Sequence, residues 1–287
     1  MATLRLLCIS LFIVSFQTAC LEKAQYGIGG DPLNSGTSAG GTVWNPSFLQ
    51  GLVAWIDTSS VMYQDSGCSV PAQVDTDPVA CVRGSSANRL EFTTIGSRPE
   101  IETRAGQQGL YFDGNDSLEN LAAAALVNGA TGFEVIAVVQ SDRASQDRCF
   151  FDVENSDNRD DVLSLRYDSR GLNGGCTECL KIGIQTDQGN TQTEAASGIQ
   201  STGIQALGAS WNSGNTITTY ASGVAAVSHT RAALTGSLQG AQKMLIGDGS
   251  KRNWQGMIYE LLYFERELSA AERSQVMSYL DSKWGPL

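Results

Sequence analysis

The sequence has few charged residues and a single histidine. Asp, Glu, Lys and Arg together make up 17% of the 287 residues, and Gly, Ser, Thr, Asn and Gln fill the difference. That balance is typical of a secreted β protein with polar turns. Because His229 has no second histidine to work with, the sequence supports neither a His-based metal cluster nor a Ser-His-Asp triad. We expect His229 to lie in an exposed loop between strands.

Positive charge is scarcer than negative charge. The chain has 19 Lys and Arg residues against 30 Asp and Glu residues, which gives a net charge of −11. An acidic protein repels phosphate groups, so this balance argues against a nucleic-acid partner. It is compatible with bound cations or with neutral glycans.

The first 20 residues are predicted to be an export signal. Arg5 precedes a nearly continuous apolar run from Leu6 to Phe16, which is too short to span a bilayer as a helix. The run leads into Gln17-Thr18-Ala19-Cys20, which resembles a bacterial lipoprotein processing site with Cys20 as the lipidated residue. An ordinary signal peptide cleaved near Ala19 is the alternative.

The remaining chain is predicted to be a tether followed by one domain. Residues 21–45 are rich in Gly, Ser and Asn without a period, which is typical of a flexible linker. Residues 46–287 show no repeat and no change in composition. Because Leu21 rather than Asp follows the cysteine, we expect an exported protein that is lipid-anchored at the outer membrane or cell surface.

The body of the chain contains about a dozen short apolar or alternating segments separated by turns. This spacing predicts an all-β fold, a jelly-roll sandwich of two antiparallel sheets. Residues 59–88 contain few apolar runs and are expected to form a long loop, and residues 118–127 a helical turn. The expected strands are 53–57, 89–95, 109–112, 133–141, 149–154, 162–168, 179–186, 206–212, 216–221, 243–247 and 257–264.

The C-terminal stretch predicts a strand that runs into a short helix. Residues 257–264 are almost wholly apolar, as in a central strand that is covered on both faces. Ser269 and Glu272 have the spacing of a capping box. The helix after them places Val276, Leu280 and Trp284 on one stripe, and Gly285-Pro286 ends it.

The cysteines predict two disulfides in the mature chain. An export signal implies an oxidising compartment, so we expect Cys68 to pair with Cys81. Strands 149–154 and 162–168 form a hairpin whose end meets the start of the next strand, so we prefer Cys149 paired with Cys176 or Cys179. The alternative joins Cys176 to Cys179 and leaves Cys149 outside any disulfide.

Several segments together resemble the concanavalin A-like lectin/glucanase superfamily, and its laminin-G-like jelly-roll domains in particular. The resemblance covers roughly Gly51 to Leu287 and implies the same sandwich fold for this chain. Its strongest part is Gly-x-Ile-x-Glu-x-x-x-Tyr followed by Arg-x-Leu-Ser-x-x-Glu-Arg. The matching residues are Gly256, Ile258, Glu260, Tyr263, Arg266, Leu268, Ser269, Glu272 and Arg273, with Leu52–Asp57, Leu110–Gly114, Phe133–Gln140 and Tyr220–Gly223 upstream.

The family's glucanases carry catalytic carboxylates in the pattern Glu-x-Asp-x-x-Glu, and no Glu of this sequence begins that pattern. Glu260 stands alone among apolar neighbours, and we expect it to bond a backbone amide or an arginine. The sequence therefore favours non-catalytic binding of a glycan or protein ligand at the cell surface. The alternatives are a glycoside hydrolase with an unrecognised carboxylate pair and a structural adhesion protein.

Two groups of residues are candidates for binding. Trp211, Trp254 and Tyr63 lie near predicted loops, where an aromatic ring could stack on a sugar. A short acidic segment could supply the six to eight oxygen ligands that Ca²⁺ prefers, and the resemblance implies such a site at a sandwich rim. Its candidate ligands are Asp152, Glu154, Asp157, Asp160 and Asp161.

Overall fold

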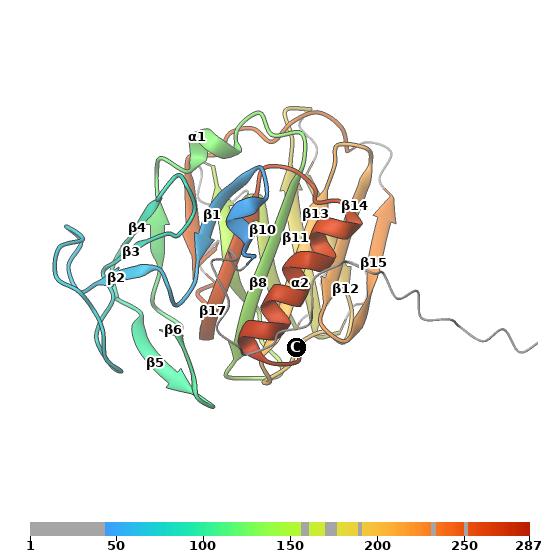
Figure 1. Cartoon of the computed structure of the whole chain (residues 1–287). Helices are drawn as coiled ribbons and strands as arrows, with labels where there is room; N and C mark the ends of the chain where they lie inside the picture. The colour runs from blue at the N-terminus through green and yellow to red at the C-terminus, as the bar shows by residue number, and fades with distance from the viewer. Residues whose placement is uncertain (1–43, 156–160, 170–176, 189–190, 231–233, 250–251) are drawn as a thin grey trace, which may run out of the picture. The chain divides into compact units, whose positions relative to one another are not determined.

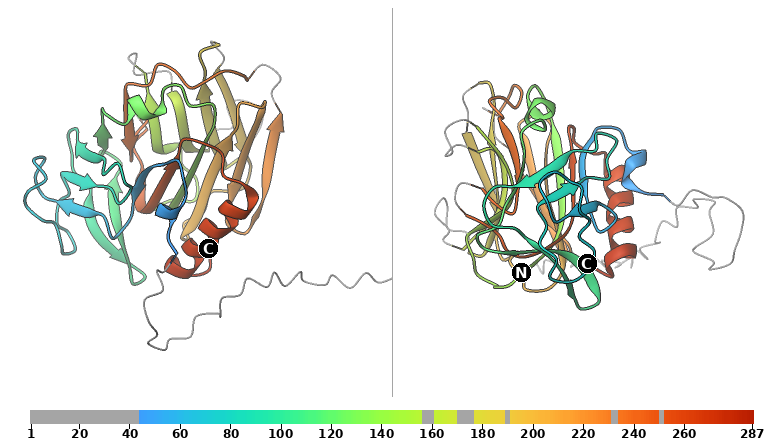
Figure 2. Two further views of the ribbon diagram at one scale, coloured as in Figure 1. Left: turned by 45° about the horizontal axis from the view of Figure 1, so that its top comes forward. Right: turned by 90° about the vertical axis from the view of Figure 1, so that its left-hand side faces the viewer.

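The computed structural model describes residues 44–287, apart from 156–160, 170–176, 189–190, 231–233 and 250–251. These residues form two antiparallel β-sheets packed face to face, with helix α2 (Ala270–Trp284) on the outer face of one sheet (Figures 1 and 2). The prediction of an all-β jelly-roll sandwich with a short C-terminal helix is therefore confirmed.

Sheet A carries the helix, and β17 lies near its middle. β1 and β6 pair with opposite halves of the same edge of β17. In spatial order, sheet A contains β15 (Val224–Thr230), β14 (Thr216–Ala221), β13 (Gln205–Trp211), β8 (Phe133–Ser141), β17 (Gln255–Phe264), β6 (Gln107–Asp113) and β5 (Glu100–Arg104), with β1 (Leu52–Ile56) paired to β17.

Sheet B forms the other layer of the sandwich. It contains, in spatial order, β12 (Thr191–Ala196), β11 (Cys179–Gln185), β10 (Asp161–Asp168), β9 (Arg148–Glu154), β16 (Lys243–Ile246), β7 (Leu118–Asn120), β4 (Glu91–Thr94), β3 (Cys81–Arg83) and β2 (Val61–Tyr63). Two further helical turns are η1 (Pro46–Phe48) and the expected α1 (Ala124–Val127).

The central strands of sheet A are apolar on both faces because each face meets a different layer. Along β8, Val135, Ala137 and Val139 pack into the core between the sheets. The alternate residues Ile136 and Val138 pack into a second core beneath α2. A strand that is covered on both sides reads as a continuous apolar run, which is why the sequence revealed β8 and β17 so clearly.

Helix α2 begins and ends where the sequence predicted. The Ser269 hydroxyl accepts from the Glu272 backbone, and the Glu272 carboxylate accepts from the Ser269 backbone, which completes the capping box. The predicted stripe of Val276, Leu280 and Trp284 is buried against sheet A. A cap of this kind stabilises a helix by about 1 kcal/mol, so most of the helix stability comes from the packed stripe.

A β-bulge in β9 changes which side chains enter the core. Leu165 of β10 is opposite Phe151, but Arg166 is opposite Cys149, so Phe150 is the extra residue. Phe150 and Phe151 therefore both pack into the core between the sheets. Phe150 meets the rings of Tyr167 and Trp254 edge-on, which fixes the start of β9 against the inner layer.

The long loop expected at 59–88 contains two short strands, β2 and β3, at the end of sheet B. The predicted disulfide between Cys68 and Cys81 is present and ties the connecting segment to β3. The strands are only three residues each, too short to produce a periodic signal. The sequence also missed β5, β12, β15 and β7, the last of which occupies the start of the helical turn expected at 118–127. His229 lies in β15 rather than in a loop.

The preferred pairing of Cys149 was wrong. Cys179 is in a disulfide, whereas Cys149 is a thiol whose Sγ donates to the Phe151 carbonyl oxygen at 3.2 Å. β10 lies between β9 and β11, and neighbouring strands are about 4.8 Å apart, so Cys149 and Cys179 are too far apart to bond. Cys176 lies outside the described residues, and its bond to Cys179 stays a prediction.

Among the described residues, no helix has both the length and the hydropathy that a bilayer crossing requires.

Gly256 allows β17 to approach β8 closely. Its φ is 141°, and a Cβ at this position would lie 2.2 Å from the Gln140 carbonyl oxygen. We predict that Gly256→Ala lowers the free energy of unfolding by about 2–6 kcal/mol, because a strained φ and a backbone overlap each cost about 1–3 kcal/mol. Urea denaturation measures the loss.

Gly129→Ala is the matched control for this substitution. Gly129 also has a positive φ, 90°, but nothing lies within 4 Å of a Cβ built on it. Its substitution should cost only the backbone strain, about 1–2 kcal/mol. Equal losses for the two variants would contradict the close approach at Gly256.

Candidate functional site

The three aromatic residues predicted to bind sugars are buried. Trp211 and Trp254 are 0% exposed, and both belong to the core between the sheets. Tyr63 is 8% exposed, and the guanidinium group of Arg83 lies over its ring and donates to its hydroxyl. The prediction that these rings stack on a ligand was wrong, because their proximity to turns in the sequence did not put them at the surface.

The acidic segment does not form a metal site within the described residues. Asp152 is fully buried in β9, and a Cβ built on Gly249 would lie 2.4 Å from its Oδ2 atom, so backbone covers it. Glu154 forms an ion pair with Lys243 at 2.9 Å. Throughout the described ranges, no group of three His, Cys, Asp or Glu residues is placed to hold a metal ion.

The remaining members of the acidic segment lie in or next to the turn between β9 and β10. Asp157 and Asp160 lie outside the described residues, and Asp161 is described only by its backbone pairing with Glu154. The calcium hypothesis therefore stays a prediction that rests on this turn between β9 and β10.

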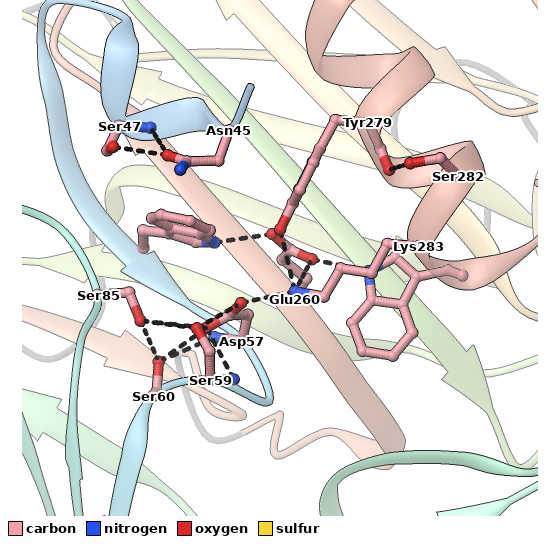
Figure 3. Close-up of polar contacts among 12 residues, drawn as sticks. Asn45, Ser47, Asp57, Ser59, Ser60, Ser85, Glu260, Tyr279, Ser282 and Lys283 are labelled. Carbon is pink, nitrogen blue, oxygen red and sulfur yellow. Dashed lines mark hydrogen bonds and ion pairs between the residues drawn. The ribbon is translucent and has the colours of Figure 1, made fainter. Parts of the chain in front are cut away.

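Two buried carboxylates on the outer face of sheet A were the strongest candidates for hidden catalytic groups. Glu260 of β17 accepts from the indole nitrogens of Trp55 and Trp284, each at 2.7 Å, and lies 3.0 Å from Lys283 Nζ (Figure 3). The expectation of a backbone amide or an arginine as its partner was wrong. Burial raises the pKa of Glu260, and the nearby Lys283 opposes that rise.

Asp57 completes this cluster without opening it to solvent. Lys283 Nζ lies 2.6 Å from Asp57, which also accepts from the hydroxyl groups of Ser59 and Ser85 (Figure 3). Asp57 and Glu260 are 2% and 1% exposed, so neither can reach a polysaccharide. The cluster joins Trp55 of β1 and Glu260 of β17 to Lys283 and Trp284 of α2, which identifies it as the attachment of the helix to sheet A.

A polar pocket of about 400 Å³ lies where the loop from β8 to β9 meets the segment before β17. We call it the arginine pocket. It contains guanidinium, amide, hydroxyl and carboxylate groups within one hollow. Its lining residues are Arg143, Ser145, Gln146, Asp147, Arg148, Ser169, Arg252 and Gln255.

The backbone around the arginine pocket is held by hydrogen bonds to the sandwich. The Gln146 amide donates to the Gln200 side chain at 2.8 Å, and Gln200 donates back to the Gln146 carbonyl oxygen at 3.0 Å. The Arg252 carbonyl oxygen accepts from the Cys149 amide at 2.7 Å, at the start of β9. Both segments of the pocket are therefore fixed before any ligand arrives.

Two side chains of the arginine pocket have hydrogen-bonding capacity that the described residues do not use. The Oε1 atom of Gln146 and the Nη1 atom of Arg252 are buried without a hydrogen-bond partner in the described part of the chain. Arg252 Nε lies 3.6 Å from Asp147 Oδ2, which is an ion pair but too long for a hydrogen bond. A buried donor without a partner is costly, so a ligand that accepts from it gains affinity.

Sequence analysis missed this pocket because its parts are more than 80 residues apart in the chain. The one available signal was the segment Asp142-Arg143-Ala144-Ser145-Gln146-Asp147-Arg148, which has four charges in seven residues of a chain that is only 17% charged. Arg252 carried no signal of its own, and only the fold brings it to Asp147.

A second hollow, of about 530 Å³, lies at the other end of β17 and includes Glu265 and Arg266. The guanidinium group of Arg266 already has hydrogen-bond partners, because it donates two hydrogen bonds to the Glu272 carboxylate, at 2.6 and 3.0 Å. Much of the rest of its wall is backbone and small side chains near α1. The arginine pocket is the better candidate for a ligand.

The fold is similar to the solved structures of an arabinofuranosidase and of a neurotoxin binding domain. An arabinofuranosidase complexed with arabinofuranosyl-α-1,2-xylobiose has a TM-score of 0.59 at 12% identity, over 79% of this chain and 61% of that chain. The binding domain of botulinum neurotoxin DC in complex with SialylT has a TM-score of 0.53 at 11% identity, over 80% and 52%. At these identities the likeness establishes the fold alone.

The comparisons of sequence gave no match. No family model and no curated protein matches the chain. The chain spans about three fifths of the arabinofuranosidase chain, so that similarity covers only part of the other protein.

The cluster around Glu260 leads to a prediction about stability. Lys283→Met removes the cation between Asp57 and Glu260, and we expect a loss of about 3–5 kcal/mol in the free energy of unfolding at pH 7, as for other broken buried ion pairs. The loss should shrink as the pH falls toward 5. Glu260, whose pKa burial already raises, then takes up a proton and needs no counter-charge.

Urea denaturation of the wild-type protein and the variant at both pH values measures this difference. Gln275→Met is the control, because Gln275 is exposed on the same helix. A loss of stability that is no larger for Lys283→Met than for Gln275→Met would mean that the cluster does not attach the helix.

Proposed function

We propose that the protein is a non-catalytic cell-surface protein that binds a glycan in the arginine pocket. The observation that carries this proposal is the lining of the pocket, where guanidinium donors, a carboxylate acceptor and amide and hydroxyl groups of both kinds meet in one hollow. Sugar hydroxyls both donate and accept, so they require such a mixed set. The hydrogen-bonded loops keep the set in place, which lowers the entropic cost of binding.

The fold supports a glycan ligand without identifying one. The similar arabinofuranosidase structure contains an arabinofuranosyl xylobiose, and the similar neurotoxin domain is in complex with SialylT. The segments of the C-terminal strand and helix resemble the concanavalin A-like superfamily, in particular its laminin-G-like domains. Because fold alone does not imply function, the proposal rests on the lining of the pocket. The similar folds are supporting evidence only.

The arginine pocket has too few carboxyl groups among its described lining residues for the common mechanisms of glycoside hydrolysis, which favours binding over hydrolysis. Glycoside hydrolases of the common mechanisms use two carboxyl groups on either side of the scissile bond. Among the described residues that line the pocket, Asp147 is the one acid. The buried pair of Asp57 and Glu260 belongs to the attachment of α2, and neither residue lines the arginine pocket or the hollow beside Glu265.

A glycan array with the purified protein tests the proposal. Ser145→Trp puts an indole into the pocket without removing a described contact, because Ser145 is exposed at the lining. We expect the wild-type protein to bind a subset of glycans and Ser145→Trp to bind them at least ten times more weakly. Ala144→Trp is the matched control, since Ala144 is exposed next to the pocket without lining it.

Two results would overturn this function. One is an array on which the wild-type protein binds no glycan, or binds with the same affinity after Ser145→Trp. The other is release of free sugar from bound glycans by the wild-type protein, which would identify a hydrolase.

We also propose that a lipid on Cys20 anchors the protein at the outer membrane or cell surface, with residues 21–45 as a tether. The apolar run before Gln17-Thr18-Ala19-Cys20 supports this part of the proposal. We expect Cys20→Ser to abolish incorporation of labelled palmitate and to move the protein from the membrane fraction to the soluble fraction. Cys8→Ser is the control, and incorporation that persists in Cys20→Ser would rule out this anchor.

A further inference from the structure

We infer that the arginine pocket selects glycans that carry an anionic group, a carboxylate or a sulfate, over neutral glycans. This inference rests on the proposed glycan-binding function and specifies the chemistry of the sugar. It departs from what the net charge of the chain suggests, because an acidic protein is expected to repel anions.

The local charge of the pocket is opposite to that of the whole chain. Arg143, Arg148 and Arg252 line the pocket, and Asp147 is the one acid among the described lining residues. Exposed charges beyond about 8–10 Å are largely screened at physiological salt, so an anion in the pocket responds most strongly to the charges that line it. The chain has only 19 Lys and Arg residues, and three of them meet at one hollow.

Arg252 is the residue that gives the pocket its preference for an oxyanion. Its side chain is 28% exposed and lines the pocket, so a ligand there can contact part of it. Its Nη1 atom is buried and has no hydrogen-bond partner among the described residues. The planar fork of an arginine matches the two oxygens of a carboxylate or sulfate better than it matches a sugar hydroxyl.

Asp147 orients the Arg252 side chain through Nε and leaves Nη1 without a hydrogen-bond partner among the described residues. The contact joins Asp147 Oδ2 to Arg252 Nε at 3.6 Å. The Arg252 amide donates to the Gly249 carbonyl oxygen at 2.9 Å, and the Arg252 carbonyl oxygen accepts from the Cys149 amide at 2.7 Å. The Arg252 backbone and Nε are therefore held, while Nη1 has hydrogen-bonding capacity that no described residue uses.

Gln146 supplies a hydrogen-bond acceptor for a hydroxyl group of the same sugar. It is 6% exposed, and its Nε2 atom is used by Ser141 and by the Gln255 carbonyl oxygen. Its buried Oε1 atom has no hydrogen-bond partner in the described part of the chain. An acidic sugar therefore meets an acceptor for a hydroxyl beside the donors for its anionic group.

Calorimetry with matched pairs of sugars tests this inference on the purified full chain. One pair is 3′-sialyllactose and lactose, the second is trigalacturonate and its methyl ester, and the third is galactose-6-sulfate and galactose. We expect the anionic member of at least one pair to bind ten times more tightly or better than its neutral partner. The advantage should fall as the salt concentration rises from 0.05 to 0.5 M, and the pairs separate carboxylate from sulfate.

Substitutions then assign the preference to the arginines. Arg252→Gln and the exposed Arg143→Gln should each reduce the advantage of the anionic sugar, and Arg252→Lys should keep part of it because the charge remains without the fork. Arg98→Gln is the control, since Arg98 is exposed outside the pocket. Thermal denaturation checks that each variant is folded.

The outcomes separate this inference from the proposed function. Equal affinity for both members of every pair, with binding still abolished by Ser145→Trp, overturns the anionic preference and leaves glycan binding in place. An anionic advantage that Arg252→Gln and Arg143→Gln both leave unchanged also overturns it. If the protein binds no sugar of the three pairs and none on the glycan array, both the proposed function and this inference are overturned.

Discussion

Besides Asp57, the buried carboxylates Glu260 and Glu134 on the outer face of sheet A fix the C-terminal helix to the sandwich. Glu260 of β17 is held by Trp55, Trp284 and Lys283. Glu134 of the neighbouring strand β8 accepts from Tyr220 and pairs with Arg273 at 2.5 Å. A buried charge is costly without its partners, so a shifted helix would leave both acids unsatisfied. These contacts fix the position of α2 more strictly than the apolar stripe could.

The arginine pocket depends on the same two strands. The loop that carries Arg143 and Asp147 leaves the end of β8, and Gln255 begins β17. The Asp142 amide donates to the Gln255 carbonyl oxygen, and the Gly256 backbone approaches Gln140 closely, so the two segments cannot separate. The rigid centre of sheet A thereby sets the distance between the groups of the pocket, and its local charge departs from the net charge of −11.

The sequence predicted most of the fold because the central elements carry strong local signals. The continuous apolar runs of β8 and β17 and the capping box at Ser269 all follow from burial and backbone chemistry. The exposed edge strand β15 and the short strands β2 and β3 lack such signals. The bulge at Phe150 shifts the register of β9, which no simple two-residue period anticipates.

The candidate site was less predictable than the fold. Trp211 and Trp254 are next to turns, yet both pack between the sheets, because the ends of β13 and the segment before β17 still cover the core. Glu260 was placed correctly on an apolar strand, but its partners come from β1 and α2, which are remote in the sequence. Arg143 and Arg252 meet only through long-range strand pairing, so no local motif marks the pocket.

A crystal structure of the protein with its tightest-binding acidic sugar tests the central claim most directly. The account predicts that the anionic group lies about 3 Å from the terminal nitrogens of Arg252, with a sugar hydroxyl near Oε1 of Gln146. A sugar bound instead in the hollow beside Glu265, along β15 or anywhere away from Arg252 would contradict it.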